Sequence, residues 1–171
     1  MSIEELKSAV DKALDSFIKA DCELLWLDAS ERAISHKLAE HLQRKFKGWH
    51  VDCEYNRDRD QPKTIEASKR KWKQLVQAGV APETIKYEDL ITDDLPTAFP
   101  DIIVHRRNTP MNLLVIEIKK SGGPDIGWDE HKLKACIRGL RYQAGLFLVF
   151  NTEVESKNRE DLIDECRWFE R

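Results

Sequence analysis

Two charged residues stand out because they lie inside a strongly apolar run. The segment Leu113-Leu-Val-Ile-Glu-Ile-Lys119 has the continuous apolar character of a buried strand, yet it carries Glu117 and Lys119. Burying a charged group in apolar surroundings is so unfavourable that such groups are usually paired, neutralised or bound to a metal ion. Glu117 and Lys119 are therefore candidates for chemistry. The plainer alternative is a structural ion pair of Glu117 with Lys119 or an arginine.

Strand geometry brings a second acid to this pair. Side chains alternate along a strand, so Glu117 and Lys119 project from one face and Ile118 from the other. If the chain from Asp101 forms a hairpin that turns about Thr109, Asp101 lies directly across from Glu117, with Cβ atoms ~5 Å apart. Two carboxylates at that distance repel unless a divalent cation lies between them. Carboxylate oxygens suit Mg²⁺, for which Mn²⁺ can substitute.

Two acids, a cation and a lysine are a sufficient set of catalytic groups for hydrolysing a phosphodiester bond. The metal lowers the pKa of a bound water and shields the phosphate, while Lys119 orients the nucleophile or stabilises developing negative charge. Glu31 is a candidate fourth member, because it shares a helical stripe with Ile34 and Leu38 that would face the sheet. The alternative for Glu31 is a first-turn acid favoured by the helix dipole, or a capping partner of Asp28.

These residues carry a family resemblance. Pro100-Asp101, a spacer of 15 residues, and Glu117-Ile118-Lys119 in an apolar strand resemble the PD-(D/E)xK nuclease superfamily, the restriction-endonuclease-like fold. The resemblance extends from Glu31 to Asn151. It implies that Asp101 and Glu117 bind Mg²⁺ with the backbone carbonyl of Ile118, and that Lys119 serves catalysis. It also implies that Glu31 matches the acid many members carry on their first helix.

The short motif alone is not specific, because similar letters recur where no apolar strand surrounds them. The recurrences are Glu5-Leu6-Lys7, Glu130-His131-Lys132, Glu155-Ser156-Lys157 and a second Pro-Asp at Pro124-Asp125. The QxxxY arrangement of exonuclease-type members is not found, since Tyr142 and Gln143 are adjacent. The expected activity is therefore endonuclease-type cleavage, with DNA favoured over RNA. The competing hypothesis is a catalytically silent module that keeps the nuclease fold for binding or assembly.

The elements that would position these residues follow from periodicity and turn signals. Helices are predicted at 1–20, from Glu31 to about 46, at 128–143 and at 158–169. Strands are predicted at 49–55, 101–105, 113–119 and 145–151. Val51, Cys53 and Tyr55 are expected on one strand face, and His105 at an exposed strand end. The order predicts an α/β fold, a mixed sheet flanked by helices, with an αβββαβ core, an N-terminal helix and a C-terminal helix.

Residues 57–99 have the least core-like composition and are interpreted as an insertion after the first strand. Arg57 and Lys63 of this segment are candidates for substrate binding, because basic residues outnumber acidic ones from 57 to 73. On the helix after the glycine-rich loop, Lys132 and Lys134 are further candidates. Exposed basic residues are more often plain solvent contacts, so both groups remain hypotheses.

Length and composition limit the number of domains and the classes of protein to which the chain can belong. A chain of 171 residues is long enough for one domain with a real core, and a formal net charge of −3 argues against a nonspecific nucleic-acid coat protein. The four cysteines show no zinc-ligand spacing and are expected to be free thiols. No apolar run approaches the length of a membrane span, which predicts a cytoplasmic protein without a membrane partner. A homodimer is left open.

Overall fold

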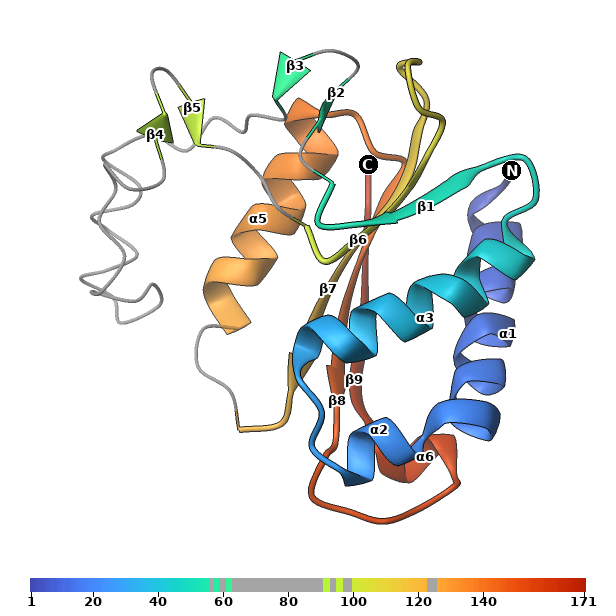
Figure 1. Ribbon diagram of the computed structural model, residues 1–171. Helices are drawn as coiled ribbons and strands as arrows, with labels where there is room; N and C mark the ends of the chain where they lie inside the picture. Colours follow the sequence, from blue (N-terminus) through green and yellow to red (C-terminus); the bar gives the residue numbers. More distant parts are fainter. Residues whose placement is uncertain (56, 59–60, 63–90, 93–94, 97–99, 123–125) are drawn as a thin grey trace.

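The computed structural model has a five-stranded sheet at its centre (Figure 1), and describes residues 1–55, 57–58, 61–62, 91–92, 95–96, 100–122 and 126–171. The strand order is β1-β6-β7-β8-β9. β7 and β8 are parallel, and the other neighbours are antiparallel. The strands are β1 (His50–Cys53), β6 (Ile102–His105), β7 (Asn112–Lys120), β8 (Ala144–Phe150) and β9 (Ile163–Glu170). The predicted α/β class with a mixed sheet is confirmed.

Helices cover both faces of this sheet. The helices are α1 (Ile3–Asp21), α2 (Glu23–Trp26), α3 (Glu31–Lys45), α5 (Ile126–Gly139) and α6 (Arg159–Leu162). α1 and α3 pack on one face, in an apolar cluster that includes Phe17, Leu38 and Ile116. α5 packs on the other face, over Val115 and Phe147. Figure 1 shows α5 on one side of the strands and the α1–α3 pair on the other.

The central hairpin has the register expected from the sequence. Ile102 pairs with Ile116, and Val104 pairs with Leu114. Both pairs follow from a turn about Thr109. The register shifts between Val104 and His105, so the last pair is His105 with Asn112. Residues at the start of β6 therefore face the end of β7, where the charged residues lie.

The C-terminal helix expected over 158–169 is wrong. Only the short helix α6 forms there, and β9 follows it as an edge strand paired along the whole of β8. Trp168 packs on the α1–α3 cluster and Phe169 on the α5 cluster, so the segment buries residues on both faces. β8 is apolar throughout and would otherwise leave its backbone donors and acceptors at a bare edge. Pairing with β8 therefore outweighs the local helical pattern.

The face predicted for Tyr55 is also wrong. Val51 and Cys53 pack against the α1–α3 cluster as expected, whereas Tyr55 packs against the cluster under α5. Glu54 has φ 48°, a left-handed conformation that interrupts the alternation of a strand. The chain thus changes face immediately after β1.

Parts of the predicted insertion lie beyond the described residues. Within 57–99, the structure describes two small ribbons, formed by β2 (Arg57–Asp58) with β3 (Gln61–Pro62) and by β4 (Ile91–Thr92) with β5 (Leu95–Pro96). Neither ribbon belongs to the five-stranded sheet. The four cysteines are free, as predicted. Across the described ranges, no helix combines the length and apolar character needed to span a bilayer.

Candidate functional site

The first turn of α3 brings Glu31 to the end of the sheet. Ser30 caps the helix by accepting a hydrogen bond from the Ala33 N–H at 3.3 Å, which leaves Glu31 as the first helical residue. Its carboxylate accepts a hydrogen bond from the Lys120 N–H at 3.3 Å and lies 3.5 Å from the Lys119 Nζ. Glu31 thus points toward β7, as the helical stripe predicts.

The alternative that pairs Glu31 with Asp28 in a cap is wrong. The N-cap is Ser30, and the Asp28 carboxylate instead forms an ion pair with the Lys120 Nζ at 2.7 Å. That contact lowers the pKa of the exposed Asp28 carboxyl, chiefly through the hydrogen bond from Lys120. Glu31 and Asp28 therefore hold the start of α3 against the last two residues of β7.

Asp101 lies immediately before β6 and contacts β7 directly. Its Oδ2 accepts a hydrogen bond from the Ile118 N–H at 2.7 Å. This bond extends the hairpin pairing by one step and fixes the carboxylate beside the Glu117–Lys119 segment. The Ile118 side chain is fully buried against the α1–α3 cluster. The neighbouring residues therefore project from the opposite face, toward α5.

Glu117 is the most deeply buried acid of the described chain, with only 2% of its surface exposed. It pairs along the ladder with Phe147 of β8, in an otherwise apolar part of the sheet. Lys119 lies one strand step further on, and its side chain is 21% exposed. The site therefore grades from a buried carboxylate to a lysine at the solvent boundary.

Asp101 also lines a cleft of about 420 Å³ between the start of α3 and the end of β1. Arg32 and Glu54 form an ion pair at 2.6 Å at this cleft. Burial, followed by the charges of Asp101, Asp52 and Glu54, raises the pKa of the Cys53 thiol to about 11. Cys53 is thus a neutral thiol at physiological pH.

The described residues do not form a complete set of metal ligands by themselves. Among the residues whose placement is described, no three His, Cys, Asp or Glu side chains lie together as a ready set of metal ligands. Asp101 and Glu31 approach the Glu117–Lys119 segment from different elements, one through the Ile118 N–H and the other through the Lys119 Nζ. The four predicted residues are therefore brought to one end of the sheet, without a three-acid cluster.

Of the four predicted substrate-binding residues, the structure describes the side chain of Lys134 alone. Lys63 and the side chains of Arg57 and Lys132 lie outside the described part of the chain. Lys134 is exposed, forms an ion pair with Glu130 at 3.1 Å and lies 5.0 Å from the ring centre of Phe169 on β9. The sheet order puts β9 three strands away from β6, so Lys134 is not close to Asp101.

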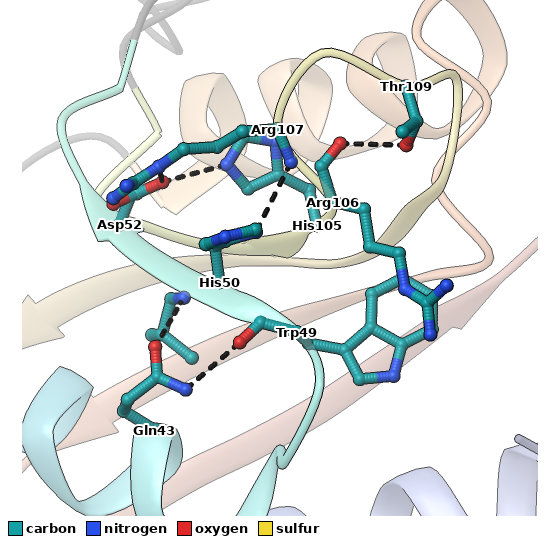
Figure 2. Close-up of polar contacts among 9 residues, drawn as sticks. Gln43, Trp49, His50, Asp52, His105, Arg106, Arg107 and Thr109 are labelled. Carbon is teal, nitrogen blue, oxygen red and sulfur yellow. Dashed lines mark hydrogen bonds and ion pairs between the residues drawn. The ribbon is translucent and has the colours of Figure 1, made fainter.

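A buried polar network that the sequence analysis did not predict lies at the other end of β6. His105, expected at an exposed strand end, is only 4% exposed, and its Nε2 lies 2.8 Å from the Asp52 Oδ2. Arg107 donates two hydrogen bonds to the same carboxylate (Figure 2). Burial alone raises the pKa of Asp52, but the bonds from Arg107 and His105 outweigh it and hold the pKa below its ordinary value.

This network was missed because it depends on a pairing between distant segments. β1 and β6 place His50 opposite His105 and Asp52 opposite Ile103. The acid and the two basic residues then meet on the face under α5. The only signal in the sequence was an acid at the middle of one predicted strand and a histidine at the end of another.

Comparisons of this chain with protein-family models, with curated proteins and with solved structures found no match.

Proposed function

We propose that the protein is a metal-dependent nuclease that hydrolyses phosphodiester bonds in DNA by an endonuclease mode. The observation that carries the proposal is the meeting of Asp101, Glu117, Lys119 and Glu31 at one end of the sheet. A buried carboxylate beside a second carboxylate is unfavourable in a purely structural site. A divalent cation bound between the two carboxylates would offset their repulsion and could bind the phosphate of a substrate.

The order of elements supports the same proposal. α3, β1, β6, β7, α5 and β8 follow one another as helix, three strands, helix and strand. This order is similar to the αβββαβ order expected of the restriction-endonuclease-like core, with α1 before it, β2–β5 between β1 and β6, and α6 and β9 after it. In that core the hairpin strands carry the acids and the lysine, and here β6 is preceded by Asp101 while β7 contains Glu117 and Lys119.

The donor chemistry fits Mg²⁺, with Mn²⁺ as a substitute. Mg²⁺ is commonly held by one or two carboxylates, with water and substrate phosphate completing its shell, so a cluster of three protein acids is not required. Asp101 and Glu117 would supply carboxylate oxygens, and the Ile118 carbonyl lies between Glu117 and Lys119 in the chain. When bound, the ion would supply a water of lowered pKa and shield the negative charge of the phosphate.

Side chains of this protein would stabilise the charge that develops during hydrolysis and hold the substrate. Hydrolysis forms a bond from the water oxygen to phosphorus and breaks the bond from phosphorus to the ester oxygen, which takes up a proton. Lys119 lies where its ammonium can stabilise the charge that develops on the phosphoryl oxygens. Glu31, 3.5 Å from the Lys119 Nζ, positions that ammonium. Arg57, Lys63 and Lys132 are proposed as substrate contacts.

Cleavage assays with matched variants test this proposal. Purified protein is incubated with supercoiled plasmid, linear duplex and single-stranded DNA in Mg²⁺, Mn²⁺ or EDTA. Asp101→Ala is compared with Asp15→Ala, which removes the same group from the exposed face of α1. We expect metal-dependent cleavage that Asp101→Ala abolishes and Asp15→Ala preserves. Equal cleavage by wild type and Asp101→Ala would remove the assignment of the site.

A second candidate function is a binding or assembly module of the same fold without catalysis. Two observations favour it: the net charge of −3, and a carboxylate of Asp101 that is already engaged by the Ile118 N–H. Calorimetric titration with Mn²⁺ separates the two candidates. Binding that disappears in Glu117→Ala disfavours the silent module, whereas a folded protein that takes up no Mn²⁺ supports it.

A further inference from the structure

The other end of the sheet lies opposite the one where Asp101, Glu117 and Lys119 lie. β1 begins there, β6 ends there, and β7 and β8 both begin there. Three connecting segments, 45–50, 106–111 and 138–143, meet at this end. Their contacts include the Arg107 N–H on the His50 Nδ1 at 3.3 Å and the Gln143 N–H on the Asn112 carbonyl at 3.2 Å. These segments are called the hairpin-end surface below.

The hairpin-end surface is strongly basic in a chain that is acidic as a whole. Its three segments contain no aspartate or glutamate, and all of their lysines and arginines are exposed. Two described acids border these segments: Asp52 forms an ion pair with Arg107, and Glu170, which lies opposite Ala144 on β9, forms an ion pair with Lys7. The exposed cations are Lys45, Lys47, Arg106, Arg107, Arg138 and Arg141.

The donors of the surface are held in place before any ligand arrives. The turn is closed by the Arg106 N–H on the Met111 carbonyl at 2.9 Å and by the Thr109 hydroxyl on the Arg106 carbonyl at 2.8 Å. The Arg106 guanidinium lies 5.1 Å from the ring centre of Trp49, as Figure 2 shows. A side chain already fixed by stacking loses less conformational freedom when it binds a ligand.

His50 adds an oriented donor to the same surface. Its Nδ1 accepts a hydrogen bond from the Arg107 N–H, so the proton of the neutral ring is on Nε2. The ring is exposed, so this N–H can reach a ligand oxygen. His50 and Arg106 therefore present N–H donors from neighbouring loops, which suits phosphate oxygens.

The arrangement favours the backbone of a duplex over unstacked bases. Single-strand binders offer aromatic faces on which bases stack. The aromatic residue here, Trp49, is half-buried and has Arg106 over its ring. The surface thus offers charge and N–H donors in place of a free stacking platform, and phosphate contacts of this kind position a protein on a duplex without reading its sequence.

We propose that the hairpin-end surface binds backbone phosphates of double-stranded DNA to one side of the bond that is cut. The choice of DNA as partner rests on the proposed function. The five residue-to-residue steps from Asp101 to Arg106 span roughly 16 Å at strand rise. At 3.4 Å per step this is about five base pairs. The surface therefore extends the footprint about half a helical turn beyond the acidic site.

DNA binding measured without metal tests the proposal. Fluorescence anisotropy of a labelled duplex of about 20 base pairs is recorded in EDTA over a series of salt concentrations. The triple variant Lys47→Ala, Arg106→Ala, Arg141→Ala is compared with the control Lys12→Ala, Lys19→Ala, Lys157→Ala. The control removes the same charge from exposed lysines elsewhere. A second triple variant with glutamine at 47, 106 and 141 keeps side-chain length, and circular dichroism confirms folding of each protein.

The plot of log K against log salt has a negative slope. We expect both triple variants at 47, 106 and 141 to make this slope less negative by about 2.7, close to 0.9 for each lost phosphate contact. The control should keep the wild-type slope. Equal slopes for all proteins would overturn the proposal, as would a loss of single-strand binding as large as the loss of duplex binding. A duplex bound through this surface but never cut would refute the nuclease and leave this inference standing, because binding is measured in EDTA.

Discussion

Metal-dependent thermal stability separates a cation site from a structural ion pair at Glu117. The pairing of Ile102 with Ile116 puts Asp101 across from Glu117, and cross-strand neighbours have Cβ atoms ~5 Å apart. At an effective dielectric constant near 20, two like charges at that distance repel by about 3 kcal/mol. A divalent cation between them removes this repulsion. For a chain of this length each kcal/mol shifts Tm by about 2–4 °C, so saturating Mn²⁺ should raise Tm by on the order of 10 °C.

The assay is a circular dichroism melt of wild type and Glu117→Gln, each in EDTA and in millimolar Mn²⁺. The Gln variant keeps size and polarity but lacks the second charge, so its Tm should not respond to Mn²⁺. Glu155→Gln, an exposed substitution on the loop before α6, is the matched control and should respond like wild type. A wild-type Tm that is the same with and without Mn²⁺, or an equal rise of Tm in Glu117→Gln, would show that no cation binds between Asp101 and Glu117.

Three further predictions concern the scaffold. The depressed pKa of Asp52 contributes stability that is present above its unfolded value near 4 and is lost as pH falls through the folded value. Asp52→Asn should therefore lower the free energy of unfolding by about 1–3 kcal/mol at neutral pH. In urea titrations at decreasing pH, the difference in free energy of unfolding between this variant and wild type should become smaller; a difference that stays constant with pH contradicts this. Ser30→Ala should cost about 1 kcal/mol through the lost N-cap, measured by urea unfolding and contradicted by unchanged stability. Leu146→Ala, at a fully buried position of β8, should cost about 2–5 kcal/mol in the same assay; a loss below 1 kcal/mol would show that β8 is not core.

Local pattern was sufficient for the hairpin and for one helix. The apolar run that contains Glu117 and the turn residues near Thr109 fixed both strands and their register, because a slip of one residue would turn every side chain to the wrong face. The start of α3 at Glu31 followed from the helical stripe that includes Glu31, Ile34 and Leu38. This is why the structure brings Asp101, Glu117, Lys119 and Glu31 to one end of the sheet, as the hairpin and the helical stripe predict.

Long-range pairing was beyond the reach of local pattern. The strand β9 has a helical spacing of apolar residues, and only the bare edge of β8 decides its conformation. The burial of His105 depends on Asp52, which is far away in sequence and arrives through the β1–β6 pairing. The change of face at Tyr55 depends on a left-handed backbone at Glu54, and glutamate is not a residue type that signals such a conformation.

The most direct measurement of the central claim is the initial rate at which saturating Mg²⁺ supports nicking of supercoiled plasmid by wild type, Glu117→Gln and Glu155→Gln. We predict that wild type and Glu155→Gln nick at equal rates, and that Glu117→Gln is slower by about a hundredfold or more, as expected when charge stabilisation of a transition state is lost. Equal rates for all three proteins, or no nicking by wild type in either Mg²⁺ or Mn²⁺, would contradict the account.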